Sequence, residues 1–452
     1  MRRLLAVLCC IASLTALPVA AADRVDRQRL AVATALPADA RATLDRLVGD
    51  AIHAQSLPGG VLVVTSSQRV LYRKAYGVRT LEPRTVANDP STIYEFASAT
   101  KPLATATAVM VLAQRGVLRL NERVSRWIPE FAQNGKHDVT LLQLLTHTGG
   151  MQIDYVRADY QADIPTILAH TYAAPLRFAP GTKFEYSDLA FITLAAVVTR
   201  AAGVPYERFV QEQIFRPLGM RDAFFDTTID PAHAARLAPQ TRNQTVQKLR
   251  DDFGTVPGLN GHAGVLATTD DVALFARAYL RAARGESTPG FALTPASVRA
   301  MTEPRYVGEG QARGIGWDLD SAYSRNRGEI FARGGFGHTG SSGTSVWIDP
   351  ATDVAVVFAS NAHYPDDRGT TLYLEAMLDT VVAARLEHAR DARDPLDAAQ
   401  EQSARFSADT ARSALGFPAT PGPAPTPKPS LTGKPLSFDV PSPVRAAGEP
   451  IP

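Results

Sequence analysis

The chain has 452 residues, with 47 Lys and Arg against 45 Asp and Glu, 45% hydrophobic residues and two cysteines. The balanced charge excludes a dedicated nucleic-acid binder, which would show a basic excess, and the apolar content excludes wholesale disorder. Two cysteines are too few for a disulfide scaffold or a cysteine-based metal cluster. At roughly 150 residues per domain, the length would allow about three domains.

The first 22 residues have the pattern of a secretory signal peptide. A basic start precedes an apolar run over residues 4–17 and three small residues. A membrane anchor is the alternative, but this run is shorter than the roughly 20 residues that span a bilayer. Removal of residues 1–22 would take away both cysteines, Cys9 and Cys10, and leave 45 basic and 45 acidic residues. We therefore predict an exported protein of the bacterial periplasm, without a transmembrane segment after cleavage.

A linker over 23–37 precedes a body in which apolar spacing predicts helices and strands. A helix over 38–55 is followed by strands over 61–65 and 70–76. A mostly helical middle has helices over 100–114, 141–145, 189–201, 206–215 and 270–283. Strands return over 314–319, 344–348 and 354–359, and a last helix covers 370–389. This order predicts an α+β fold, in which one antiparallel sheet is closed by the two chain ends, flanked by N- and C-terminal helices, and carries an inserted all-helical lobe.

The body over 38–390 is followed by a polar helical extension over 391–416 and a proline-rich tail over 417–452. Proline occupies 11 of the 36 tail residues. Because proline lacks an amide donor and disfavours helix in its neighbour, the tail should be extended and solvated. A disordered tail is the simpler interpretation, and a spacer or wall-associated arm is the alternative.

Several common catalytic patterns are absent from the sequence. The nine histidines form no HxH or HExxH pattern, so no metal site is predicted. There is no G-x-S-x-G, which weakens an α/β-hydrolase triad. There is also no phosphate-binding loop or dinucleotide glycine fingerprint, and we therefore predict no cofactor.

The tetrapeptide Ser98-Ala-Thr-Lys101 is an S-x-x-K pattern. At helical spacing the two side chains share one face, with Cβ atoms about 5–6 Å apart. A serine hydroxyl becomes a nucleophile when a nearby base takes its proton, and a lysine in apolar surroundings can do so because desolvation lowers its pKa. Pro102 fits only near a helix start, where the helix dipole favours negative charge developing near Ser98. The alternative is an ordinary helix start with a lysine whose stem is buried.

Two further motifs follow in chain order. Tyr186-Ser187-Asp188 lies about 90 residues after the first motif, and His338-Thr339-Gly340 lies about 150 residues further on. The order S-x-x-K, Y-x-[N/D], [K/H]-T-G resembles the serine β-lactamase and penicillin-binding-protein superfamily, specifically its class C-like branch of serine hydrolases and D-Ala-D-Ala carboxypeptidases. The resemblance covers residues 38–390 and implies the β-lactamase/DD-peptidase fold. It includes the connecting stretches 141–150, 215–220, 261–265 and 337–345.

The resemblance implies a role for each matching residue in the reaction. Ser98 would be the acylated nucleophile, and the backbone N–H groups of Ser98 and Ser341 would form the oxyanion hole. Lys101 and Tyr186 would be the proton-transfer pair, with Tyr186 as a phenolate-like base and later as an acid toward the leaving group. A cation beside Tyr186 should lower the pKa of its hydroxyl.

The remaining residues of the two later motifs would bind the substrate. His338, Thr339 and Gly340 would line the site, with Thr339 at the substrate's carboxylate end. Asp188 stands where the superfamily usually has asparagine, and an ionised carboxylate cannot donate a hydrogen bond. It could instead pair with Lys101, keep the lysine charged and shift the base role toward Tyr186. We expect this substitution to disfavour efficient β-lactam hydrolysis.

Together these features predict a serine hydrolase that works through an acyl-enzyme on D-amino-acid cell-wall peptides or small esters. The alternatives are a weak β-lactamase, or a penicillin-binding sensor that does not turn over. The partner is a small molecule or a peptidoglycan peptide, and not a nucleic acid. His147 and His262 are interpreted as core or loop histidines. The three tryptophans, Trp127, Trp317 and Trp347, are interpreted as packing residues.

Overall fold

The computed structural model describes residues 36–153, 162–225, 229–241, 260–308, 311–328, 331, 334–365 and 371–387. Its main feature is a nine-stranded antiparallel sheet with the strand order β3-β2-β1-β12-β11-β10-β9-β8-β7. The strands are β1 (Gly59–Thr65), β2 (Val70–Thr80), β3 (Val86–Ala87), β7 (Arg305–Gly308), β8 (Gln311–Arg313), β9 (Asp318–Asp320), β10 (Phe336–Gly340), β11 (Thr344–Asp349) and β12 (Val354–Ser360). A second small sheet has the order β4-β6-β5, with β4 (Tyr94–Glu95), β5 (Phe224–Phe225) and β6 (Val265–Ala267).

The sheet is closed by the two ends of the described body. Strand β1 pairs with β12, so that Val61 lies opposite Ala359 and Val63 lies opposite Val357. Both strands are buried along their whole length because both faces of the sheet are covered. This confirms the predicted antiparallel sheet, which the early and late strands build together.

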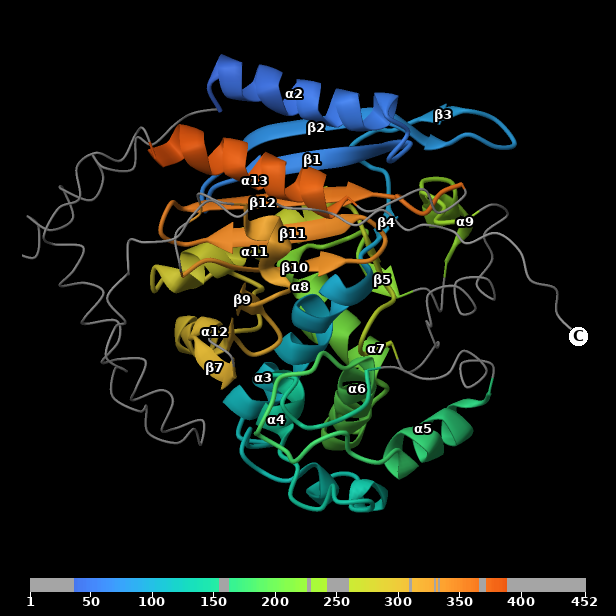
Figure 1. The fold of residues 1–452 in the computed structure, drawn as a ribbon, viewed down its shortest axis with the longest axis vertical. Coiled ribbons are helices and arrows are strands. Elements are labelled where there is room, and N and C mark those ends of the chain that lie inside the picture. The colour runs from blue at the N-terminus through green and yellow to red at the C-terminus, as the bar shows by residue number, and fades with distance from the viewer. Residues whose placement is uncertain are drawn as a thin grey trace, which may run out of the picture.

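Alternate residues of β1 enter two different cores. Leu62 and Val64 pack with side chains of α2 (Ala38–His53) and α13 (Leu372–Glu387), and these helices contact each other. Val61 and Val63 face the larger core, which includes the helical lobe. Figure 1 shows α2 and α13 along the sheet at the top and the lobe below it. The predicted terminal helices and inserted helical lobe are therefore confirmed.

The remaining helices follow one another along the chain, and most of them build the lobe below the sheet. They are α3 (Thr107–Gln114), α4 (Leu141–Leu145), α5 (Ile164–Ala173), α6 (Asp188–Ala202), α7 (Tyr206–Val210), α8 (Arg216–Leu218), α9 (Pro231–Ala234), α11 (Thr269–Ala283) and α12 (Pro295–Thr302). Helix α6 shows how local sequence sets the ends. The Ser187 Oγ accepts the Ala190 N–H at its start, and Gly203 adopts φ 70° just after its end.

Two sequence predictions need correction. The predicted strand over 314–319 is wrong at its start, because residues 314–317 form a turn and β9 begins only at Asp318. Gly316 has φ 73° and donates its N–H to the Leu145 carbonyl, and an added Cβ would lie 2.4 Å from the Ala106 Cβ. The predicted helix over 100–114 is not uniform. It begins with a 3₁₀ turn (Ala97–Ala99) and a π-helical segment (Lys101–Ala106) before α3.

Several predicted segments lie outside the described residues. These are the signal peptide over 1–22, most of the 23–37 linker, the extension over 391–416 and the tail over 417–452. The domain boundaries therefore stay predictions. Among the described helices, no single one has the length and apolar composition of a membrane span, and one pair bent by 75°, Asp188–Ala202 with Tyr206–Leu218, meets that test only when the two are taken together.

Candidate active site

Ser98 and Lys101 lie at the junction between the small sheet and the helical lobe. Strand β4 leads into the 3₁₀ turn that carries Ser98, and the π-helical segment begins at Lys101. The Lys101 Nζ donates a hydrogen bond of 3.1 Å to the Ser98 Oγ. Pro102 follows where its missing N–H leaves no helical hydrogen bond unmade. The three-residue spacing therefore brings the hydroxyl and the amine together, as the sequence predicts.

The Lys101 ammonium is buried and held by three groups. Its Nζ lies 2.5 Å from the Asp188 Oδ1 and donates to the His262 carbonyl oxygen at 2.9 Å. It also lies 4.7 Å from the centroid of the Tyr186 ring. Burial opposes the charge, but the negative charge of Asp188 and the interaction with Tyr186 outweigh it and raise the pKa of Lys101. Lys101 is therefore a charged ammonium at neutral pH, and His262 contributes through its main chain.

Tyr186 precedes α6 and places its hydroxyl in a buried position. Burial raises the pKa of Tyr186, and the Lys101 charge lowers it while the Asp188 charge raises it further. The net pKa is above the ordinary value of a phenol. The neighbouring cation lowers this pKa, as the sequence predicts, but desolvation is the larger contribution and outweighs it.

The Tyr186 ring lies between two other aromatic rings. The His147 ring is stacked at 4.4 Å between centroids with an interplanar angle of 23°, and the Tyr323 ring is stacked at 4.8 Å and 20°. Two nearly parallel rings this close to one ring must occupy its opposite faces, because one face cannot hold both. This arrangement fixes the plane of the phenol, and the sequence gives no signal for Tyr323.

The third motif lies in the interior of the sheet, on β10 between β9 and β11. The His338 ring centroid is 6.1 Å from that of Tyr186, and its Nδ1 lies 2.7 Å from the Thr339 carbonyl, to which it must donate. Burial, followed by the charges of Arg313 and Lys101, holds the pKa of His338 well below its usual range. His338 is therefore a neutral imidazole, unlike the lysine that many members of the resembled superfamily carry there.

The turn after β10 is attached to the segment that precedes Ser98. The Ser342 hydroxyl donates to the Glu95 carbonyl at 2.6 Å, and the Thr344 hydroxyl donates to the Phe96 carbonyl at 3.3 Å. Gly340 approaches the same backbone so closely that an added Cβ would lie 2.4 Å from the Phe96 carbonyl oxygen. These contacts bring the Ser341 segment against the Ser98 turn, which is the arrangement that a shared oxyanion hole requires.

The residue before Ser98 has a strained backbone. Ala97 has φ 43°, which a residue with a Cβ rarely adopts. Its N–H donates to the Glu95 Oε1 at 2.8 Å, and the same oxygen accepts the Gly264 N–H at 3.3 Å. The Glu95 carboxylate therefore holds the turn that presents Ser98. Sequence reasoning missed Glu95, since an acidic residue three positions before a serine has no distinctive pattern.

A second cation, Arg313, acts on His147 and His338. The Arg313 side chain is completely buried, its Nη1 lies 3.2 Å from the Asp318 Oδ1, and its guanidinium carbon lies 5.3 Å from the centroid of Phe184. Its charge contributes to lowering the pKa values of both His147 and His338. Sequence reasoning missed Arg313, because nothing in its local pattern indicates burial.

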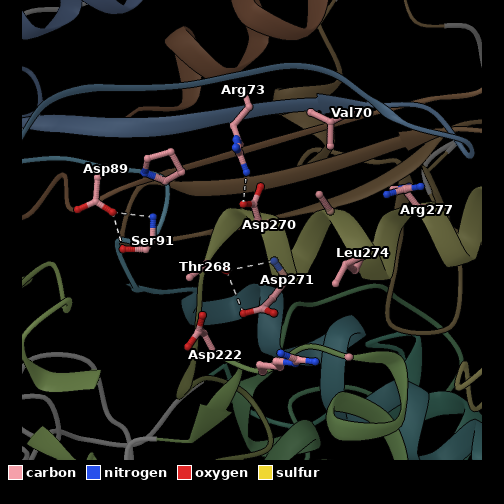
Figure 2. A pocket seen from close by; sticks show the side chains of 14 residues that line it. Val70, Arg73, Asp89, Ser91, Asp222, Thr268, Asp270, Asp271, Leu274 and Arg277 are labelled. Atoms are coloured by element: carbon pink, nitrogen blue, oxygen red, sulfur yellow. Dashed lines mark hydrogen bonds and ion pairs between the residues drawn. The ribbon is translucent and has the colours of Figure 1, made fainter. Parts of the chain in front are cut away.

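Within the described segments, no group of three His, Cys, Asp or Glu residues is placed to hold a metal ion. A surface hollow lies between β2 and α11, and Figure 2 shows that its charged side chains include Arg73 paired with Asp270 at 2.7 Å. None of the predicted site residues, all of which are described, lines this hollow. The predicted site residues therefore lie away from this hollow.

A serine contacted by a buried lysine, with a tyrosine beside that lysine, is the arrangement of a serine hydrolase, in which a neighbouring base activates the hydroxyl. The chain matches the family described as Beta-lactamase over residues 44–378. It belongs to this family, and within it the chain has class C-like features.

Curated relatives cover most of the catalytic body. The esterase EstB of Burkholderia gladioli is 31% identical over 373 residues, which cover 72% of this chain and 91% of EstB. A protein of Escherichia coli K12 named "Putative D-alanyl-D-alanine carboxypeptidase" is 27% identical over 357 residues, 70% of this chain and 81% of that protein.

Solved structures show the same fold. EstCE1, described as a hydrolase with promiscuous acyltransferase activity, has a TM-score of 0.63 at 21% identity, covering 76% of this chain and 98% of EstCE1. A penicillin-binding protein homologue from Caulobacter crescentus also has a TM-score of 0.63 at 21% identity, covering 78% and 98%. These similarities confirm the β-lactamase/DD-peptidase fold.

Proposed function

We propose that this protein is an exported serine hydrolase that forms an acyl-enzyme on Ser98 and acts on small esters or on D-Ala-containing peptides of the cell wall. The observation that carries the proposal is the contact chain from Ser98 through Lys101 to Asp188, with Tyr186 beside the ammonium. The substrate classes are those in the names of the EstB and Escherichia coli relatives. Export, in our proposal to the bacterial periplasm, is supported by the signal-peptide pattern of residues 1–22.

The charge arrangement favours Tyr186 as the base. Because Asp188 and Tyr186 keep Lys101 protonated, the reactive form is the minor one in which Tyr186 has lost its proton beside the ammonium. The Ser98 Oγ then bonds to the substrate carbonyl carbon while its proton passes to the Tyr186 oxygen. Tyr186 returns this proton to the departing alcohol or amine as the old bond breaks. Water attacks the acyl-enzyme by the same route and releases the acid from Ser98.

The substrate side of the site supports a neutral or anionic ligand. His338 is uncharged, and Thr339 and Gly340 lie beside it on β10. In our proposal the Ser98 and Ser341 N–H groups polarise the carbonyl, since developing negative charge is stabilised by preorganised donors. Asp188 is committed to Lys101, so an amide donor toward a β-lactam is missing at this position. We expect slow β-lactam hydrolysis and faster cleavage of esters or peptides.

The test compares the wild type and Ser98→Ala on p-nitrophenyl esters, a D-Ala-D-Ala peptide and nitrocefin. Turnover of an ester or peptide that is abolished by Ser98→Ala is the expected result. Equal activity of the two proteins would remove Ser98 from the mechanism. Stable labelling by a fluorescent penicillin without turnover of any substrate would favour a sensor, and rapid nitrocefin turnover would favour a β-lactamase.

A further inference from the structure

We propose that His147 is a positioning residue for Tyr186: its neutral ring accepts a main-chain hydrogen bond next to the tyrosine and supports one face of the phenol. The inference rests on the proposed function, because it concerns how the proton-transfer group is held. His147 lies 49 residues after Ser98 in the sequence, just after α4. It is not proposed to exchange protons with the substrate.

Two separate contacts join His147 to the tyrosine segment. The Ser187 N–H donates to the His147 Nδ1 at 3.0 Å, which fixes the peptide that directly follows Tyr186. The imidazole is also stacked on the Tyr186 ring at 4.4 Å and 23°. The His147 side chain is buried, with 1% of its surface exposed. One side chain therefore restrains both the main chain and the ring plane of Tyr186.

The hydrogen bond requires one particular form of the imidazole. Because the Ser187 N–H is a donor, the Nδ1 of His147 must present a lone pair, and the ring proton must be on Nε2. A doubly protonated ring could not accept this bond. Burial, followed by the charges of Arg313 and Lys101, holds the pKa of His147 well below its usual range, which agrees with the neutral form.

Main-chain hydrogen bonds also connect the segment of His147 to the segment of Tyr186. Its carbonyl accepts the Glu185 N–H at 3.0 Å, and the Asp188 N–H donates to the Ile153 carbonyl at 2.7 Å. His147 has φ 58°, an unusual conformation for a residue other than glycine. Such a conformation persists where surrounding contacts determine it, and it occurs often at functional sites. These hydrogen bonds join the segment after α4 to the segment that begins α6.

The chemistry of the side chain distinguishes positioning from ordinary packing. Phenylalanine at position 147 would fill the space and keep the stack, but it could not accept the Ser187 N–H. Asparagine has an oxygen bonded to Cγ, as Nδ1 is in histidine, and it tolerates positive φ. It would keep the acceptor and lose the stack. The two substitutions therefore separate the hydrogen bond from the ring.

The experiment measures kcat and KM of the full chain for a p-nitrophenyl ester in five proteins: the wild type, Ser98→Ala, His147→Phe, His147→Asn and Phe225→Leu. Phe225→Leu is a control for loss of packing, because Phe225, which lies on β5, is buried against Tyr206 and Phe215. For His147→Phe we expect kcat to fall by about tenfold or more with KM within about threefold, because a buried N–H is left unsatisfied beside Tyr186. We expect His147→Asn to recover most of this loss and Phe225→Leu to keep kcat.

The outcomes separate this inference from the proposed function. If the wild type shows Ser98-dependent turnover and His147→Phe keeps kcat within about twofold, the positioning role is wrong and the proposed function stands. If the wild type shows no Ser98-dependent turnover, the proposed function fails, and the positioning role fails with it. Nitrogen NMR of the wild type gives a check that does not depend on activity. A pyridine-type Nδ1 and a pyrrole-type Nε2 at His147 are expected, and a protonated Nδ1 overturns the inference.

Discussion

The ammonium of Lys101 and the carboxylate of Asp188 form a 2.5 Å ion pair, and the same ammonium donates a hydrogen bond of 3.1 Å to the Ser98 Oγ. The lysine is completely buried, and the Asp188 side chain is 20% exposed. Asparagine, the usual residue of the resembled superfamily at this position, could not neutralise the lysine. The pair therefore keeps Lys101 charged before the substrate binds, and in the proposed mechanism it leaves the base role to Tyr186.

The first prediction concerns the pH dependence of Asp188→Asn. The Asp188 charge raises the pKa values of both Lys101 and Tyr186. Removing it lowers both, so the reactive form appears at lower pH and the rising limb of kcat/KM moves in the acidic direction. The measurement is the pH profile of ester hydrolysis. Asp138→Asn, at an exposed carboxylate paired with Arg123, is the matched control. A limb that stays in place or moves to higher pH contradicts the prediction.

The second prediction tests the contact between β10 and the Ser98 turn. An added Cβ at Gly340 would lie 2.2 Å from the Thr344 Oγ1 and 2.4 Å from the Phe96 carbonyl oxygen. We expect Gly340→Ala to lower kcat/KM by about tenfold or more and the free energy of unfolding by about 1–3 kcal/mol, because β10 must move away from Phe96. Ester hydrolysis and urea unfolding measure these effects.

A glycine on α2 provides the control for Gly340→Ala. Gly49 has nothing within 4 Å of an added Cβ. We expect Gly49→Ala to keep full activity and to raise the free energy of unfolding by about 0.5–1 kcal/mol, since alanine is the better helix former. Wild-type activity in Gly340→Ala would show that the close approach at β10 is not needed for the reaction.

The third prediction concerns the stability of the fold at Asp271, in the first turn of α11. Figure 2 shows its carboxylate bonded to Thr268, whose hydroxyl donates to it at 2.9 Å. Burial raises the pKa of Asp271 to about 6 from an ordinary value of 3.8. The folded state therefore retains the proton longer than the unfolded chain, and stability falls as the pH rises between these two values.

Asp271→Asn should remove this dependence. Relative to the wild type, its free energy of unfolding should rise between about pH 4 and pH 6, by up to about 3 kcal/mol, and then stay constant. Urea unfolding at several pH values measures the difference. Asp270→Asn, at the neighbouring carboxylate that pairs with Arg73 on the surface, is the control for replacing a carboxylate at the start of α11. A constant difference between Asp271→Asn and the wild type at all pH values would disprove the assignment.

The sequence predicts correctly those elements whose pattern of apolar residues depends only on which of their faces are buried by other layers of the fold. The run over 354–359 is apolar because β12 is covered on both faces, and such a run reads as a buried strand from sequence alone. The turn over 314–317 could not be predicted in the same way. Its conformation depends on Gly316 packing against Ala106 and bonding to Leu145, which are distant in the sequence.

For the active site, the sequence by itself determined the pair Ser98 and Lys101, because three positions on one helical turn place the two side chains together whatever the rest of the fold does. It also identified Tyr186 and His338 as members of ordered motifs. Only the tertiary structure decided which of Lys101, Tyr186 and His338 carry a charge. The His262 carbonyl lies 161 positions from Lys101, and Arg313 lies 25 positions before His338. Closure of the sheet and packing of the lobe bring these groups together, and the pKa of a buried group depends on which charges surround it in space.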